Sequence, residues 1–557
     1  MHSYSRRTFL TQSSTALAGL GLGIRRMPGT YTFMQALPMQ SRQPVAKFFP
    51  EMVEPDHLRE LAQAAVDAAI HAGADYADIR VSDVRKMTYG LVWENVVGGN
   101  LYLGMAYGVR VRCGGAWSFA FGADLTTDEI TRTARSATSA ARGLANVLSE
   151  PFPMARVPVV REEWTLPVQI DPFSVPPDDH AQLILAYSNA GSRVPDGQFL
   201  NASFRWTGET RVFASSEGSL ITQRLTNVIP TVGVRGTRAW MMRGVALPVP
   251  GFQPRSAGFE IMLGEAHYDR IRAATEDAVR LSRYVRGTAD VGRFPVAMDG
   301  LSVGTIIRSS LVPAFELARV LGYDADGEGT SYLGPVGDVH GQQVFSTQLS
   351  MSTNPTPPHY SARRWDDEGV ATSAFPLIDR GRVVNYFATR ATAGALAPIA
   401  AKTGTPIPLH GSAVSGSAHH VPNGRGVELT VSPGDDGVTI DSMISQINNG
   451  LLVCGFDGRA MSDQGLISGY MAPNSHALFE VKHGKIIRRL EGGALQFNTK
   501  KLFSNLIAAG NARTMQTHAI NTGVSAGPVP MGWDMVVTTP AMYFKEIDLV
   551  SNIGKIR

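Results

Sequence analysis

The chain has 557 residues, of which 44% are hydrophobic and 18% are charged. A chain this long and this apolar buries several cores, which excludes wholesale disorder and gives three or four domains as a first expectation. Its 51 basic and 48 acidic residues leave a formal charge of +3 without a dense basic run, so nucleic acid is not an expected partner. The 2 cysteines exclude a disulfide framework and a Cys-rich zinc module.

The first 40 residues read as an export signal. Arg6-Arg7 is followed by Phe9-Leu10, by a weakly apolar stretch over 11–24 and by Arg25-Arg26. This stretch is shorter than the roughly 20 apolar residues that span a bilayer. The order resembles a twin-arginine leader, a receptor-read address for proteins exported already folded. We therefore predict export by the twin-arginine route to the periplasm or another extracytoplasmic compartment. An N-terminal arm that happens to hold two arginines is the alternative, and cleavage of the leader stays open, as does its retention as an anchor.

Residues 55–150 are expected to form an N-terminal α+β domain. Leu58, Leu61 and Ala65 recur at helical spacing ahead of Gly73, which predicts a helix over 57–72. Apolar residues alternate with others over 101–113, which predicts strands. Thr126 and Glu129 have the spacing of a capping box, so a second helix is expected to begin there.

The region 151–290 is expected to be a central domain or linker region. Its proline-rich start over 151–177 indicates a linker, followed by strands near 204–206 and 210–214 and a helix over 267–284. From Phe294 onward, short apolar runs separated by Gly, Pro, Asn and Asp predict a β-rich C-terminal domain over 291–557. Tight turns are expected at 379–381 and 482–484. The predicted fold class is α+β, with helices on an antiparallel sheet in the N-terminal domain, and no membrane span apart from the leader is expected.

A series of short motifs runs in order from about residue 55 to the C-terminus. Together they resemble the TldD/PmbA family of bacterial peptide-processing proteins. The motifs are Ala77-Asp78-Ile79-Arg80-Val81, Tyr107-Gly108-Val109-Arg110-Val111, Phe121-Gly122-Ala123-Asp124-Leu125-Thr126, Leu321-Gly322-Tyr323, Gly329-Thr330-Ser331, Trp365-Asp366-Asp367-Glu368-Gly369 with Pro376-Leu377-Ile378 and Gly381, Gly450-Leu451-Leu452-Val453, and His483-Gly484-Lys485.

The resemblance implies a zinc peptidase fold with a defined ligand pattern. In the active member of the family, a helix carries His-Glu-x-x-x-His and a cysteine near the C-terminus completes the site. Two imidazoles and a thiolate hold Zn²⁺ with one position open for water, and the glutamate acts as general base. Another member lacks the metal and serves as its paired subunit. The resemblance also implies a dimer and a cavity that admits unfolded peptide.

Laying the family pattern over residues 304–331 places its first histidine at Arg308, its glutamate at Ser309 and its second histidine at Pro313. A guanidinium is always protonated, and proline has no donor atom, so neither can ligate zinc. A slipped register that uses Glu316 does not restore the flanking ligands. The family's terminal Cys-Gly loop maps near 523–527, where Ser525 is the nearest match. We therefore predict a degenerate site with no catalytic residue, no bound metal and no cofactor.

Other candidate residues have a structural interpretation that is more common than a functional one. Cys454 lies in an apolar strand and Cys113 in a strand of alternating apolar residues, and both are expected to be buried structural thiols. Asp366, Asp367 and Glu368 precede a glycine and are expected to form a turn, with peptide or ion contact as the alternative. Three histidines, His410, His419 and His420, lie in a Gly/Ser-rich loop, where metal binding is the less expected role, and His340 and His359 are isolated. Gly523 to Gly527 matches Gly-x-Ser-x-Gly, but the flanking residues indicate a loop and not a nucleophile elbow.

Two functions stay open from the sequence. The preferred one is a non-catalytic homologue that binds peptide or unfolded polypeptide, as a homodimer or as a heterodimer with a metal-bearing family member. The alternative is an active hydrolase of the same fold that acts on small or unfolded peptides with ligands outside the family pattern.

Overall fold

The computed structural model describes most of the chain after residue 50. The chain divides into two compact units, residues 1–47 and 48–557, and every described residue belongs to the second. The proposed leader and Ser525 lie outside the described residues. No helix in the described part is long and apolar enough to cross a membrane. The described residues are 51–92, 95–147, 154–236, 244–327, 329–404, 406–455, 459–462, 465–472, 478–521 and 534–551.

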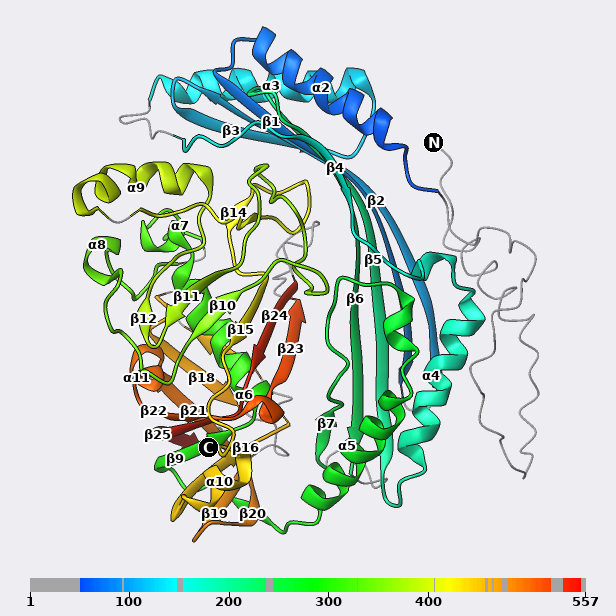
Figure 1. Ribbon diagram of the computed structural model, residues 1–557, viewed down its shortest axis with the longest axis vertical. Coiled ribbons are helices and arrows are strands. Elements are labelled where there is room, and N and C mark those ends of the chain that lie inside the picture. Colours follow the sequence, from blue (N-terminus) through cyan, green and yellow to red (C-terminus); the bar gives the residue numbers. More distant parts are fainter. Residues whose placement is uncertain are drawn as a thin grey trace, which may run out of the picture. The chain divides into compact units, whose positions relative to one another are not determined.

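A seven-stranded sheet, called here the N-terminal sheet, holds the first half of the described chain. Its strand order is β3-β2-β1-β5-β6-β4, with β7 added beside β6, and all neighbours are antiparallel except the parallel pair β4 and β6. The long strands β1, β2, β5 and β6 run side by side (Figure 1). The strands are β1 (Tyr76–Val92), β2 (Asn95–Cys113), β3 (Ala116–Gly122), β4 (Arg161–Thr165), β5 (Gln198–Ser215), β6 (Leu220–Arg235) and β7 (Ala246–Pro248).

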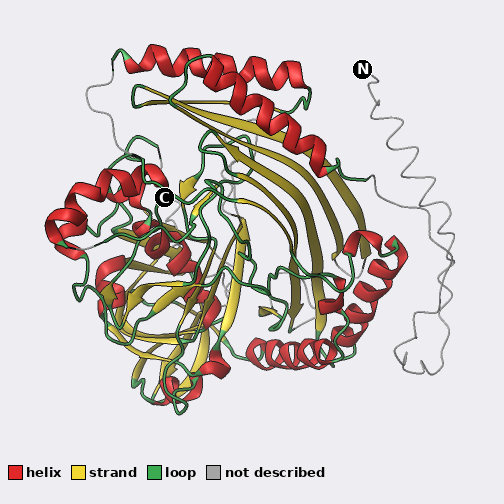
Figure 2. Cartoon of the chain, turned by 45° about the horizontal axis from the view of Figure 1, so that its top comes forward, coloured by secondary structure: helices red, strands yellow, loops and turns green. Residues whose placement is uncertain are grey.

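Two pairs of helices cover this sheet, one pair at each end. Helices α2 (Pro55–His71) and α3 (Thr127–Ala145) pack on one end, and α4 (Pro177–Ser192) and α5 (Ala266–Ser282) on the other (Figures 1 and 2). The apolar stripe predicted for α2 is buried, and Gly73 ends the helix with φ at +94°, a backbone region that favours glycine. The helices expected over 57–72 and 267–284 are therefore confirmed within two residues.

Three local predictions for this region need correction. Thr126 is the residue before α3, but its side chain makes no capping hydrogen bond, so the expected capping box does not form. The expected linker 151–177 contains β4, which pairs with β6 through Arg161 and Leu220 and is too short and charged to show a strand pattern. The two short strands expected over 204–214 are parts of the single strand β5. Residues 55–150 and 151–290 thus contribute strands to one sheet.

The second half of the chain forms a ten-stranded sheet and a six-stranded sheet. The turns predicted at 379–381 and 482–484 join β11 (Phe375–Asp379) to β12 (Arg382–Val383) and β19 (Leu478–Lys482) to β20 (Lys485–Glu491). Both turns have positive φ, at Arg380, Gly381, His483 and Gly484. In order across the larger sheet lie β17 (Arg459–Ser462), β18 (Ser468–Ala472), β21 (Gly493–Asn498), β25 (Met542–Ser551), β9 (Gly292–Met298), β16 (Asn449–Val453), β19 (Leu478–Lys482), β20 (Lys485–Glu491) and β8 (Arg286–Thr288), with β22 (Leu506–Ala509) beside β25. In order across the smaller sheet lie β12 (Arg382–Val383), β11 (Phe375–Asp379), β10 (Met351–Thr353), β15 (Glu428–Val431), β24 (Asp534–Thr539) and β23 (Gln516–Asn521).

The largest hydrophobic core belongs to this second half. It gathers apolar side chains from strands of both sheets around the buried helix α6, whose seven residues are all inaccessible to solvent or nearly so. The expectation of a β-rich C-terminal region is correct. However, the short apolar runs did not predict several short helices that the region also contains. A small hairpin of β13 (Ala413–Val414) and β14 (Asn423–Gly424) lies apart. The helices are α6 (Gly300–Ile306), α7 (Leu317–Val320), α8 (Val336–Val339), α9 (Arg390–Thr403), α10 (Ile440–Ser445) and α11 (Thr499–Ser504).

Candidate functional site

The residues predicted at the degenerate metal positions lie in consecutive helical turns that follow α6. Asp299 caps α6 by accepting a hydrogen bond from the Ser302 amide at 2.9 Å. A π-helical turn over Ile307–Leu311 then carries Arg308 and Ser309, and a 3₁₀ turn over Val312–Phe315 carries Pro313. π-Helical turns are rare in proteins, and many of those that occur lie at functional sites.

The chemistry of these three residues does not fit a zinc ion. The Arg308 guanidinium is partly buried, its Nε has no hydrogen-bond partner, and burial lowers its pKa. Ser309 Oγ donates to the carbonyl of Ile306 at 3.1 Å. Glu316, the candidate of the slipped register, is buried and accepts from Arg319 Nε at 2.9 Å. Within the described ranges, no group of three or more His, Cys, Asp and Glu side chains is placed to hold a metal.

The acidic segment Asp366-Asp367-Glu368 forms a buried turn, as the sequence predicted. Asp366 accepts hydrogen bonds from the backbone amides of Glu368, Val370 and Ala413, each at 2.9 Å. The first two bonds stabilise the turn, and the third connects it to β13. Burial and the charge of Glu368 raise the pKa of Asp366 to about 8, although these three amides oppose the shift. Gly369 follows with φ at +74°, and a Cβ there would lie 2.6 Å from the ring of Phe213.

The other two carboxylates of the turn pair with arginines of the N-terminal sheet. Asp367 lies 3.2 Å from Arg80 Nη1 and also pairs with Arg211, and both arginines lower its pKa against the effect of burial. Glu368 lies 2.6 Å from Arg110 Nη1. We call Arg80, Arg110, Arg211, Asp367 and Glu368 the ion-pair cluster.

Burial makes this cluster a strong connection between the two halves of the described chain. Asp367 and Glu368 are each 1% exposed and Arg80 is 2% exposed. Glu368 also accepts the backbone amide of Arg390, the first residue of α9, at 2.6 Å. The cluster therefore fixes the N-terminal sheet, the acidic turn and the start of α9 relative to one another.

A cavity of about 570 Å³ lies beside the ion-pair cluster. Its walls come from β3, from the first turn of α9, from the segment that follows α7 and from the loop and hairpin over 414–425. Trp117, Phe119 and Val421 contribute apolar surface, whereas Asp324 and Arg425 contribute opposite charges. The sequence does not predict this cavity, because its wall residues come from segments up to about 300 positions apart and the motifs that contain Arg110 and Tyr323 do not indicate a shared site.

The remaining candidates have separate and mostly structural partners. Cys113 and Cys454 are buried and unpaired, as predicted, and burial raises the pKa of both thiols. His410 contacts Ser373 Oγ at 2.9 Å, His419 contacts the Gly122 carbonyl at 3.0 Å and His420 contacts Ser417 Oγ at 3.1 Å, so the three rings serve different neighbours. His340 has a buried Nδ1 without a partner, and His359 contacts Glu428 at 2.9 Å.

The helices and mainly antiparallel sheets define a mixed α+β fold. Residues 291–550 match a family model described as the PmbA/TldA metallopeptidase C-terminal domain. No curated protein sequence matches the chain significantly. This match supports the resemblance to the TldD/PmbA family that the motifs predicted, over residues 291–550.

Solved structures share the fold over almost their whole length. TldE from Thermococcus kodakarensis superposes on this chain with a TM-score of 0.64 at 14% sequence identity. The superposition covers 89% of this chain and 100% of the TldE chain. A proposed modulator of DNA gyrase from Thermotoga maritima gives 0.65 at 14% identity, with 88% and 100% covered. A similarly described protein from Bacteroides thetaiotaomicron gives 0.61 at 16% identity, with 89% and 99% covered. At these identities the likeness establishes the fold.

Proposed function

We propose that this protein is an exported, non-catalytic TldD/PmbA family member that binds peptide or unfolded polypeptide. It would act as a homodimer or as the partner subunit of a metal-bearing relative. The observation that carries the proposal is the chemistry at the turns after α6. The gap-free alignment predicts Arg308, Ser309 and Pro313 at the positions of the family's two histidines and glutamate. These three residues lie in the turns after α6, and their side chains do not suit zinc.

Two features away from these turns support binding better than catalysis. Neither the ion-pair cluster nor the cavity beside it depends on a bound metal, so a non-catalytic family member can retain both. The cavity volume of about 570 Å³ falls in the range of roughly 300–1,000 Å³ that is typical of small-ligand sites.

Metal content tests the non-catalytic part of the proposal. The purified mature protein should contain far less than one zinc per chain by plasma mass spectrometry, and it should not cleave an unfolded substrate such as β-casein. Binding of β-casein should still be measurable by fluorescence anisotropy. Stoichiometric zinc that disappears when one His or Asp is replaced, or cleavage that a chelator abolishes, would instead favour the active hydrolase.

Export is tested by the leader itself. Changing Arg6-Arg7 to Lys-Lys should leave the protein in the cytoplasm, whereas the same change at Arg25-Arg26 should leave export intact. Fractionation of cells that express each version distinguishes the two. Normal export of the Arg6-Arg7 variant would refute the twin-arginine route.

Assembly is tested by light scattering on the purified protein. A mass of two chains supports the homodimer. Co-purification with a relative that retains His-Glu-x-x-x-His supports the partner-subunit role. A stable homodimer that does not bind such a relative would argue against that role.

A further inference from the structure

Asp324 contributes a carboxylate to the wall of the cavity beside the ion-pair cluster. It lies in the turns that follow α7 and is half-buried. Asn423 Nδ2 donates to Asp324 Oδ2 at 3.2 Å. The orientation of this amide group follows from its other end, because Asn423 Oδ1 accepts a hydrogen bond from the Gly424 amide at 2.9 Å. A neutral donor therefore holds one oxygen of the Asp324 carboxylate.

This carboxylate keeps the capacity to bind a cation. In the described part of the chain, no cationic side chain forms an ion pair with Asp324. An ionised carboxylate has two oxygens with roughly four acceptor sites, and Asn423 occupies one of them. Hydrogen bonds between a carboxylate and a cationic donor are about twice as strong as neutral ones. The free acceptor sites of Asp324 therefore favour a ligand that carries a positive group.

The two guanidinium groups of the wall, by contrast, already have carboxylate partners. Arg110 Nη1 lies 2.6 Å from Glu368, and its side chain is 7% exposed. Arg425 Nη1 lies 3.7 Å from Glu316, and its side chain is 11% exposed. We therefore assign neither arginine a contact with the ligand.

His420 also lines the cavity, but it adds no positive charge. Burial lowers the pKa of His420, and the charges of His419 and Arg80 lower it further, so its ring is neutral near pH 7. Among the described wall residues, Asp324 thus carries the charge that has no counter-charge.

Much of the remaining wall is apolar. Trp117 and Phe119 alternate with Ser118 along β3, so both rings project from the same side of the strand. Val414 and Val421 line the cavity from β13 and from the loop that follows it. A ligand that fills this space therefore needs an apolar body as well as a positive group.

We propose that this cavity binds a primary ammonium group attached to an apolar body, with the ammonium group at Asp324 and the apolar body against Trp117 and Phe119. Two sources carry this chemistry, the N-terminal residue of a polypeptide and a free aryl- or alkylamine. A ligand without the charge leaves Asp324 without a cationic partner, and a ligand without the apolar body buries little apolar surface. The proposal goes beyond the proposed function, because it names the chemical group that the cavity recognises.

Calorimetric titration of the full-length mature protein with three probes tests the proposal. The amine 2-phenylethylamine should bind. Its neutral analogue 2-phenylethanol and the ring-free methylammonium ion should each bind about 10- to 100-fold more weakly. Equal affinity for the amine and the alcohol, or no binding of the amine, overturns the proposal without any variant.

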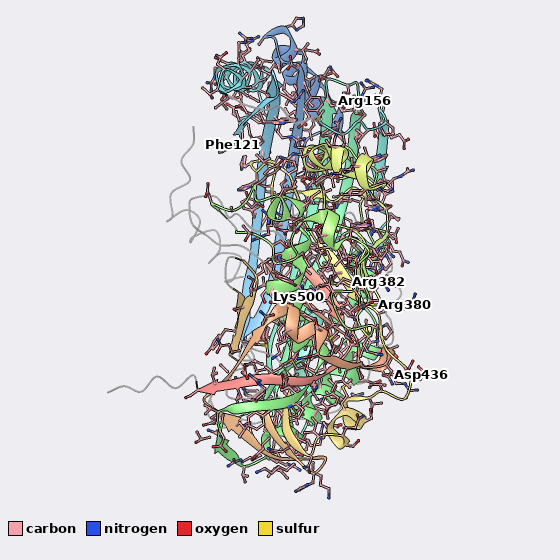
Figure 3. The ribbon with its side chains drawn as sticks, turned by 90° about the vertical axis from the view of Figure 1, so that its left-hand side faces the viewer. Phe121, Arg156, Arg380, Arg382, Asp436 and Lys500 are labelled. Atoms are coloured by element: carbon pink, nitrogen blue, oxygen red, sulfur yellow. The ribbon has the colours of Figure 1, made fainter. Side chains whose placement is uncertain are left out.

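Substitutions of three aspartates assign the ammonium group to one wall residue. Asp324→Asn should weaken binding of 2-phenylethylamine about 10- to 100-fold and leave 2-phenylethanol unchanged, because the alcohol has no charge to pair. Asp326→Asn and Asp436→Asn remove the same charge from exposed residues outside the wall (Asp436 is labelled in Figure 3) and should leave both affinities unchanged. An equal loss in all three variants, with circular dichroism that matches wild type, overturns the assignment.

Two peptide probes distinguish the sources of the ammonium group. If Leu-Ala-Ala amide binds and its N-acetyl form binds about 10- to 100-fold more weakly, the cavity recognises polypeptide N-termini. If 2-phenylethylamine binds and Leu-Ala-Ala amide does not, free amines are the ligands, and the proposal stands in both cases. If β-casein binds but no amine does, the proposed function stands and this inference fails. Binding of amines without binding of β-casein has the opposite meaning.

Discussion

Asp367 makes more hydrogen bonds and ion pairs than either of the other two carboxylates of the acidic turn. It pairs with Arg80 and Arg211 and accepts hydrogen bonds from the Ser415 amide at 2.8 Å and the Ser415 hydroxyl at 2.7 Å. Removing one member of a buried ion pair leaves the other charge uncompensated, at about 3–5 kcal/mol. We therefore expect Asp367→Ala to lower the free energy of unfolding by about that amount.

Urea unfolding followed by tryptophan fluorescence measures this loss. Asp436→Ala, at an exposed position, should change the free energy of unfolding by less than about 0.5 kcal/mol. Equal effects of the two substitutions would mean that the ion-pair cluster contributes little to stability.

His359 gives the fold a pH-dependent contact. Its Nδ1 lies 2.9 Å from Glu428, and this hydrogen bond raises the pKa of His359, although burial opposes it. Because the folded protein holds this proton more tightly than the unfolded chain, the contact stabilises below about pH 6.5 and is lost as pH rises through the raised pKa. His359→Gln should therefore lower the urea midpoint more at pH 5.5 than at pH 8.5.

The partner of His359 supplies the control for this pH effect. In a Glu428→Gln background, the substitution His359→Gln should no longer cost more stability at pH 5.5 than at pH 8.5, because burial then lowers the pKa of His359 without an opposing carboxylate. A larger loss at pH 5.5 that persists in this background would assign the effect to another group.

Single residues also show why the site was only partly predictable. The acidic turn could be predicted because Asp, Asp, Glu and Gly are adjacent. Its arginine partners could not, because Arg80 and Arg110 alternate with apolar residues and so look like the solvent-facing positions of their strands. The second half of the chain covers that face, and nothing local in β1 or β2 indicates it.

At the scale of elements, α3 and α9 differ in how they begin. Thr389 caps α9 through a reciprocal pair of hydrogen bonds with Thr392, whereas Thr126 precedes α3 without a side-chain cap. Loss of a capping side chain typically destabilises by about 1 kcal/mol. We expect Thr389→Ala to lower the free energy of unfolding by about 1 kcal/mol and Thr126→Ala by clearly less, measured by urea unfolding.

The reverse order of these two effects would contradict the capping geometry. The comparison also shows the limit of prediction at this scale. The Thr126 and Glu129 spacing predicts where α3 begins, and that is correct, but not whether the threonine hydroxyl makes the bond. Long periodic helices were predictable, whereas β4 and the short helices of the second half were not, because tertiary pairing and burial decide them.

At the scale of the whole described chain, the two halves depend on each other. Residues 291–550 match a family domain by themselves, but Asp367 and Glu368 have their arginine partners at residues 80, 110 and 211. A fragment that begins at residue 291 would leave these buried carboxylates unpaired. We expect the fragment 291–557 to unfold at a lower urea concentration than the full chain.

The same fragment with Asp367→Asn and Glu368→Gln provides the matched comparison. It should recover part of the lost stability, because neutral amides tolerate the missing arginines better than carboxylates do. A fragment as stable as the full chain would show that the ion-pair cluster joins two independently stable domains.

The ion-pair cluster also sets the order of events during synthesis. Arg80 and Asp367 are 287 residues apart, and Arg110 and Glu368 are 258 apart. At roughly 5–20 residues per second, a ribosome needs about 15–60 s to add the acidic partner after the arginine. For that time the emerging N-terminal sheet exposes guanidinium groups on a face that will later be buried. The complete ion-pair cluster can therefore form only after Glu368 has been added to the chain.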